Sequence, residues 1–136
     1  MSEAAAPPVL LIVDDEERIL NSLRRSLRRE GFLILTAQTP HEARKWLAEH
    51  PVAVVLSDHK MPTTSGLEIL TMAAEMRPNA TRLLISGWPE QVPAEKLKEL
   101  GVRELLPKPW DDGHLKRVLQ DALLPLPPAP EPLPES

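Results

Sequence analysis

The stretch VVLSDHKMPTTSG, residues 54–66, joins an apolar run to a polar loop. Val54, Val55 and Leu56 are typical of the interior of a sheet, and Asp58 follows where the apolar run stops. Pro, Thr, Ser and Gly favour turns, so we expect the chain to leave the sheet directly after Asp58. The stretch therefore predicts an acidic side chain at the edge of a sheet, where α/β proteins usually hold ligands.

Short apolar runs of this kind recur along the chain. Each is nearly continuous rather than alternating, which is typical of strands covered on both faces in a mostly parallel sheet between helices. The five runs are VLLIV (9–13), FLILTA (32–37), VAVVLS (52–57), RLLIS (82–86) and RELLP (103–107).

The segments between these runs carry helix signals. TPHE (39–42) and SGLE (65–68) both have the spacing of a capping box, in which a hydroxyl residue precedes glutamate by three positions. Gly31 favours the end of a preceding helix. The first predicted helix covers 16–30, with Ile19, Leu23 and Leu27 buried. Two further helices begin near 39 and 65, and a fourth covers 92–100. The last helix begins at Asp111 or Asp112 and carries an apolar stripe of Leu115, Val118, Leu119, Ala122 and Leu123.

Five successive βα units predict a doubly wound α/β fold, a three-layer sandwich with a parallel sheet. The apolar pattern predicts this class but leaves the strand order open. If the order is the flavodoxin-like 2-1-3-4-5, the carboxyl ends of the first and third strands open into one crevice. Asp14 and Asp15 follow the first strand and Asp58 follows the third, so the three side chains would meet there.

Three carboxylates at one rim need a counter-charge, because two charges about 4 Å apart repel by about 4 kcal/mol at an effective dielectric of roughly 20. Mg²⁺ suits such a site, since it binds a few carboxylate and carbonyl oxygens and keeps waters for a phosphate ligand. Any one of these aspartates alone would be an ordinary loop or helix-cap residue. The metal hypothesis therefore depends on Asp14, Asp15 and Asp58 occurring together.

Two further polar residues point to the same rim. Ser86 ends the fourth apolar run and Lys108 follows the fifth. A hydroxyl donor and an ammonium beside a metal site are what a bound phosphoryl group would use. Taken alone, a serine before glycine is more often a turn former, and a lysine before proline is more often a solvated charge.

Composition limits the other classes of function. The 136 residues suffice for one ordinary domain, and the net charge of -4 argues against general attraction to nucleic acid. Absence of cysteine removes disulfides and thiolate metal sites. No apolar run approaches the roughly 20 residues of a membrane span, and the start MSEAAAPP lacks a cationic targeting region, so we expect a soluble cytoplasmic protein without membrane contact.

The prolines divide the chain. PLPPAPEPLPE, near the end, can form neither a helix nor a central strand. We therefore expect a disordered N-terminus at 1–7, one folded domain at 8–124, and a proline-rich tail or linker at 125–136.

These motifs together resemble the receiver domain of bacterial two-component response regulators, over residues 8–124. The resemblance is carried by VDDE with Asp14 and Asp15, by SDHKMPTTSG with Asp58, by LLISG with Ser86, and by LLPKPW with Lys108. It implies that Asp58 accepts a phosphoryl group from a histidine kinase or a histidine phosphotransfer protein.

The resemblance also implies the roles of the surrounding residues. Asp15, Asp58 and the backbone carbonyl of Lys60 would hold Mg²⁺, with Asp14 acting through water. Lys108 would compensate the charge of the acyl phosphate. Ser86 would donate to a phosphoryl oxygen and so change the surface of the helix at 92–100, the strand at 103–107 and the last helix, where an effector or a second copy would bind.

Such a module is not an enzyme, although it assists its own phosphorylation and dephosphorylation, and no output domain is expected in this chain. In this family the first helix commonly lies in the interface with the kinase or phosphotransfer protein. The exposed arginines of the helix at 16–30 would serve that contact, or would form an ordinary solvated face: Arg24, Arg25, Arg28 and Arg29.

Some positions depart from the family or look tuned. Leu105 stands where many receivers carry the Tyr or Phe that turns inward during switching. Lys60 either shields the acidic pocket or is solvated, and Trp88 either covers the acyl phosphate or packs on the neighbouring helix. The four histidines show no metal-ligand spacing and are expected at the surface: His41, His50, His59 and His114.

The sequence is also compatible with two alternative functions. A receiver-like interaction module that is never phosphorylated would keep the fold, and Leu105 leaves room for it. A haloacid-dehalogenase-like phosphatase also uses Mg²⁺ and an aspartate nucleophile, but it carries Asp-x-Asp on its first strand, which the DDEE of residues 14–17 does not match.

Overall fold

The computed structural model describes residues 6–123. The expectations for 1–7 and for the tail at 125–136 lie outside the described residues, apart from residues 6 and 7. Among the helices that are described, none is both long and apolar enough to cross a membrane.

Five parallel strands form one sheet in the order β2-β1-β3-β4-β5. The strands are β1 (Val9–Val13), β2 (Leu33–Ala37), β3 (Val52–Asp58), β4 (Thr81–Ser86) and β5 (Val102–Pro107). This order and the helices between the strands confirm the predicted flavodoxin-like (βα)5 sandwich.

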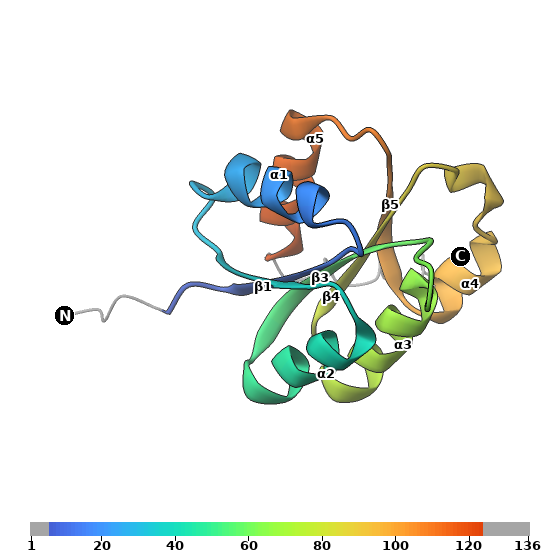
Figure 1. Ribbon diagram of the computed structural model, residues 1–136, viewed down its shortest axis with the longest axis horizontal. Coiled ribbons are helices and arrows are strands. Elements are labelled where there is room, and N and C mark those ends of the chain that lie inside the picture. The colour runs from blue at the N-terminus through green and yellow to red at the C-terminus, as the bar shows by residue number, and fades with distance from the viewer. Residues whose placement is uncertain (1–5, 124–136) are drawn as a thin grey trace, which may run out of the picture.

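Helices cover both faces of the sheet. Figure 1 shows α1 and α5 on one face and α2 and α3 on the other. The helices are α1 (Glu17–Leu27), α2 (Pro40–Glu49), α3 (Gly66–Met76), α4 (Ala94–Glu99) and α5 (Asp112–Ala122), and a short 3₁₀ helix, η1 (Pro89–Gln91), precedes α4.

Three helices begin with the side-chain caps that the sequence predicts. Thr39 accepts a hydrogen bond from the Glu42 amide at 3.2 Å, and Ser65 accepts one from the Glu68 amide at 3.3 Å. Asp111, rather than Asp112, caps α5 by accepting from the His114 amide at 2.8 Å. Each cap satisfies an amide that has no partner inside its helix, a contribution of about 1 kcal/mol.

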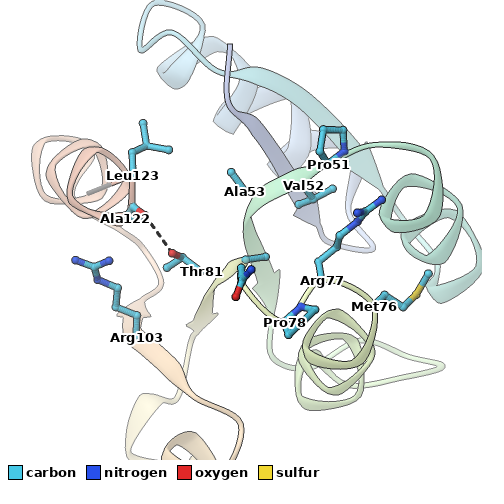
Figure 2. A pocket seen from close by; sticks show the side chains of 12 residues that line it. Pro51, Val52, Ala53, Met76, Arg77, Pro78, Thr81, Arg103, Ala122 and Leu123 are labelled. Atoms are coloured by element: carbon cyan, nitrogen blue, oxygen red, sulfur yellow. Dashed lines mark hydrogen bonds between the residues drawn. The ribbon is translucent and has the colours of Figure 1, made fainter. Parts of the chain in front are cut away.

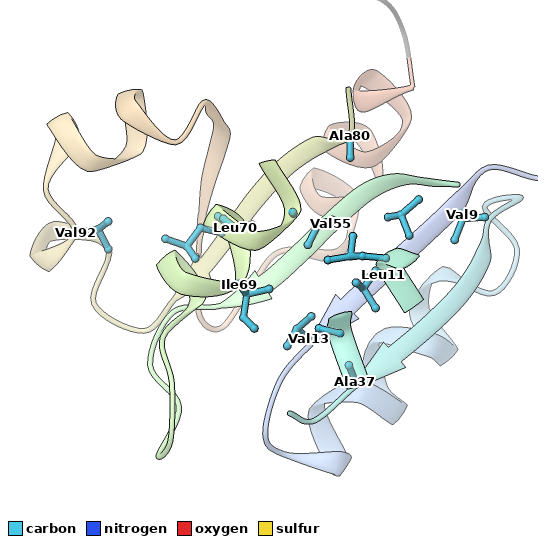
Figure 3. Packing of buried hydrophobic residues seen from close by; sticks show 14 residues of the cluster. Val9, Leu11, Val13, Ala37, Val55, Ile69, Leu70, Ala80 and Val92 are labelled. Carbon is cyan, nitrogen blue, oxygen red and sulfur yellow. The ribbon is translucent and has the colours of Figure 1, made fainter. Parts of the chain in front are cut away.

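The hydrophobic core lies in two layers, one on each face of the sheet. In β1, Val9, Leu11 and Val13 belong to the layer beneath α2 and α3, part of which Figure 3 shows, whereas Leu10 and Ile12 belong to the layer beneath α1 and α5. Successive side chains of a strand point to opposite faces, so a strand covered on both sides must be apolar at every position. This is the physical reason for the continuous apolar runs.

The two edge strands differ from the expectation that every run is covered on both faces. In β2, Leu33 is 42% exposed and Ile34, Leu35 and Thr36 are only partly buried. Most of β5 is also partly buried. An edge strand has a neighbour on one side only, so its helices cover it less completely, although its composition is the same as that of a central strand.

Two predicted helices have different bounds. The helix predicted at 16–30 ends at Leu27. It buries Leu20, Leu23 and Leu27, whereas Ile19 is only partly buried. The helix predicted at 92–100 is the six-residue α4, with Val92 buried in the core ahead of it. Proline at 93 explains the later start, because proline is tolerated at the beginning of a helix but not within it.

Candidate functional site

Three aspartates meet at the carboxyl ends of β1 and β3. Val13 pairs with Ser57 across the two strands, so the residues that follow them, Asp14 and Asp58, emerge side by side. Carboxylate oxygens of Asp14, Asp15 and Asp58 lie within 4.8 Å of one another. Asp14 and Asp58 are 1% and 6% exposed, and Asp15 is half-buried. The structure thus brings the three predicted acids together.

Lys108 places one positive charge in this cluster. Its Nζ lies 3.0 Å from Asp58 Oδ1 and 3.2 Å from Asp14 Oδ2. The Lys108 amide donates to the carbonyl of Ser86 at 2.8 Å, and this bond positions the lysine beside the end of β4. The predicted convergence of the ends of strands β1, β3 and β5 is therefore present in the fold.

The charges of the cluster are only partly balanced. Burial raises the pKa of Asp14, and the carboxylate of Asp58 adds to this, against the opposing effects of the Glu16 amide and Lys108. Burial lowers the pKa of Lys108, but its hydrogen bond to Asp58 and the charge of Asp14 outweigh burial and raise it. Lys108 is therefore a permanent cation, yet one ammonium cannot neutralise three carboxylates.

The donor set fits a hard divalent cation. A pocket of about 530 Å³ opens beside the cluster, and its lining includes Asp15, Asp58, Lys60 and Lys108. Asp14 does not line this pocket, because the Glu16 amide at 2.9 Å and Lys108 occupy its oxygens. Oxygen ligands without nitrogen or sulfur suit Mg²⁺ or Ca²⁺ better than zinc.

Ser86 lies at the same rim and is 1% exposed. Its Oγ accepts a hydrogen bond from the Trp88 amide at 3.0 Å and lies 3.3 Å from Nδ1 of His59. Leu105 is partly buried in the core layer beneath α2 and α3, where it leaves no ring beside Ser86.

Lys60 and Trp88 both line this pocket and contact each other. Lys60 Nζ lies 5.3 Å from the centre of the Trp88 ring, within the range of a cation–π contact, and it donates to Gln91 Oε1 at 3.1 Å. Trp88 remains 54% exposed. The loop after β3 and the loop after β4 are thus linked at the edge of the pocket.

The expectation that His59 lies at the surface is wrong. The residue is 8% exposed, because its amide donates to the carbonyl of Ile85 at 2.9 Å and so extends the ladder between β3 and β4 past Asp58. Burial lowers the pKa of His59, Lys60 acts in the same direction, and Asp58 opposes them. The only sequence signal for this burial was the position of His59 directly after a central strand.

A second and larger pocket, of about 700 Å³, lies at the opposite edge of the sheet (Figure 2). It is lined by residues at the amino ends of β3 and β4 and at the end of α5, and includes Arg77 and Arg103. Arg77 already donates to the carbonyl of Leu47 at 2.8 Å. None of the described residues in its lining is acidic, so its size does not make it the better candidate for a metal or phosphoryl site.

The comparisons with known proteins agree with this geometry. The family model of the response regulator receiver domain matches residues 10–120. The chain is 37% identical over 112 residues to the hydrogenase transcriptional regulatory protein HoxA of Cupriavidus necator, and the match covers 82% of this chain and 23% of that protein. It is 29% identical to the photosynthetic apparatus regulatory protein RegA of Cereibacter sphaeroides, over 95% of this chain and 70% of that one.

A solved structure with the same fold is the signal receiver domain of an HD domain-containing protein from Pseudomonas fluorescens Pf-5. The TM-score is 0.80 and the identity is 31%, over 86% of this chain and 94% of that one. The match therefore covers nearly all of that receiver domain, whereas this chain spans about a quarter of the length of HoxA.

Proposed function

Because this chain belongs to the response regulator receiver domain family, we propose that Asp58 accepts a phosphoryl group from a histidine kinase or a histidine phosphotransfer protein in a Mg²⁺-dependent reaction. Receiver domains are signalling modules rather than a classical enzyme family, and those of response regulators interact with such donors. The observation that carries the proposal is Asp58 itself, a buried carboxylate that lies 3.0 Å from Lys108 and lines an open pocket.

Each residue of the site has a separate role in the phosphoryl transfer. A carboxylate oxygen of Asp58 attacks phosphorus as the bond to the donor imidazole nitrogen breaks, and the electron pair leaves with that nitrogen. Asp15, Asp58 and the backbone carbonyl of Lys60 would hold Mg²⁺, with Asp14 acting through water. When bound, Mg²⁺ neutralises charge on the phosphoryl oxygens. Lys108 provides a fixed cation for the negative charge that the acyl phosphate adds.

Ser86 connects the chemistry to the surface. Its hydroxyl would donate to a phosphoryl oxygen, which pulls the loop after β4 inward and shifts the surface of α4, β5 and α5 toward a second arrangement. This surface is proposed to bind an effector or a second copy of the chain. The donor is proposed to contact the rim of the site and α1, which carries the exposed Arg24 and Arg25 and is followed directly by the exposed Arg28 and Arg29.

Phosphorylation by a small donor tests the proposal directly. The protein is incubated with acetyl phosphate, with Mg²⁺ or with EDTA, and its intact mass is measured. We expect one added phosphoryl group with Mg²⁺ and none with EDTA. An unchanged mass in both samples would favour the alternative of an interaction module that is not phosphorylated, for which Leu105 is the main argument. The phosphatase alternative is set aside, because the family match places the chain elsewhere.

Metal binding should stabilise the protein through Asp15. At a Mg²⁺ concentration about 100 times Kd, we expect a gain of about 2.7 kcal/mol in the free energy of unfolding, measured by urea denaturation. Asp15→Asn should lose most of this gain, because it removes a charged metal ligand. Glu17→Gln, which removes an exposed carboxylate outside the cluster, should keep it. An equal gain in Asp15→Asn would argue against the proposed ligand set.

Trp88 should slow the loss of the phosphoryl group. Its ring lies at the mouth of the pocket beneath Lys60, so it restricts the approach of water to the acyl phosphate. Trp88→Ala should raise the dephosphorylation rate roughly threefold or more. A threefold increase corresponds to a decrease of less than about 1 kcal/mol in the activation free energy. Trp88→Phe, which keeps an aromatic ring, should stay near the wild-type rate. The decay of phosphorylated protein by intact mass provides the measurement, and identical rates for all three proteins would refute this role.

A further inference from the structure

The buried imidazole of His59 contacts the hydroxyl that is proposed to receive the phosphoryl signal. We propose that His59 is a positioning residue that holds Ser86 in its unphosphorylated arrangement, by accepting the hydrogen bond that the Ser86 hydroxyl must later donate to the phosphoryl group. The inference rests on the proposed function and adds a residue to it. Its central observation is the distance of 3.3 Å between His59 Nδ1 and Ser86 Oγ.

The hydrogen bonds of Ser86 indicate which atom carries the proton. A hydroxyl has one proton to donate and two lone pairs to accept with. The Trp88 amide already uses one lone pair, and among the described residues the remaining partner of Ser86 Oγ is His59 Nδ1. If Nδ1 carried a proton, the hydroxyl proton of Ser86 would lack a partner among the described residues. Ser86 is only 1% exposed, so leaving this proton without a partner is costly. The contacts therefore favour the tautomer with Nε2 protonated and Nδ1 accepting.

His59 is held in place independently of Ser86. Its amide donates to the Ile85 carbonyl at 2.9 Å, and its carbonyl accepts from the Gly66 amide at 2.7 Å. The backbone of His59 is thus fixed at the end of β3, and its imidazole lies beside the hydroxyl that must move.

Two acceptors compete for the same proton. Before phosphorylation, the Ser86 hydroxyl donates its hydrogen bond to His59 Nδ1. Afterwards, a phosphoryl oxygen on Asp58 requires the same hydrogen bond. Each phosphorylation therefore breaks the His59–Ser86 bond, and this cost lowers the affinity of the site for the phosphoryl group.

Beryllofluoride, which mimics a phosphoryl group on aspartate, provides the test. Its Kd is measured at saturating Mg²⁺ for the wild type, His59→Phe and His59→Asn, and for the same three residues at position 59 in a Ser86→Ala background. We expect His59→Phe to bind roughly fivefold more tightly, the equivalent of about 1 kcal/mol for one neutral hydrogen bond. His59→Asn keeps an acceptor oxygen near the position of Nδ1 and should bind like the wild type. In the Ser86→Ala background the three affinities should be equal.

A second measurement tests the tautomer without any phosphoryl mimic. Nitrogen-15 NMR of the full chain should show the proton of neutral His59 on Nε2. A proton on Nδ1, an unchanged affinity in His59→Phe, or an effect of His59→Phe that persists in Ser86→Ala would each overturn the inference while leaving the phosphoacceptor function standing. Absence of beryllofluoride binding in every protein, including the wild type, would instead refute the phosphoacceptor function and with it the inference.

Discussion

Asp58→Asn should abolish phosphoryl incorporation from acetyl phosphate, because the amide that replaces the carboxylate is not a competent nucleophile. This is the largest effect that we expect from one substitution at the site. Intact mass in the presence of Mg²⁺ measures it. Asp121→Asn, at an exposed position on α5, is the matched control and should incorporate one phosphoryl group like the wild type.

Loss of folding should not explain the loss of incorporation. Asp58→Asn keeps the size of the side chain and removes one charge from a cluster of three carboxylates, so the metal-free variant should be no less stable than the wild type. Urea denaturation checks this point. Incorporation by Asp58→Asn at the wild-type level would place the phosphoacceptor elsewhere in the chain.

Gly66→Ala should destabilise the protein by about 3 kcal/mol, the upper end of what overpacking usually costs. A Cβ at this position would overlap the backbone oxygen of Asp58 and would lie 2.6 Å from Cδ1 of Leu84. A backbone atom cannot turn away as a side chain can, so the start of α3 and the end of β3 at Asp58 would have to move apart. Urea denaturation should therefore show a lower midpoint.

The chain offers a close control for this substitution. A Cβ at Gly87 would meet no atom within 4 Å, so Gly87→Ala should stay within about 0.5 kcal/mol of the wild type. Equal stabilities of Gly66→Ala and Gly87→Ala would mean that the close approach of α3 to the end of β3 is not required. The expected movement of Asp58 should also weaken Mg²⁺ binding in Gly66→Ala.

The fold class could be predicted from local patterns in the amino-acid sequence. Buried central strands such as β1 require an apolar residue at every position, and this requirement is visible as VLLIV. Helix starts can be predicted at Thr39, Ser65 and Asp111, because their side chains accept hydrogen bonds from backbone amides three residues further along the chain. With the flavodoxin-like strand order as a premise, the rule that parallel strands open their carboxyl ends at one edge then predicted Asp14 beside Asp58.

Local patterns did not reveal the extent of coverage at the edges. The apolar run of β2 reads like that of a central strand, although Leu33 is 42% exposed. The helix predicted at 92–100 begins only after Pro93, a signal that the sequence does contain, whereas the packing of Val92 into the core ahead of it is not visible there. The exposure of Leu33 and the burial of Val92 both depend on how much neighbouring structure covers the segment, which its own residues do not encode.

The amino-acid sequence by itself determined the βα alternation, the helix caps and the set of acids at the strand ends, because each depends on residues that are near one another in the chain or on the order of the strands. Only the tertiary structure decided that His59 is buried against Ser86, 27 positions away, and that Lys60 lies over Trp88. These contacts arise from the pairing of β3 with β4 and from the loops that follow them. The distances between such side chains are set by strand register and packing, so no local pattern can predict them.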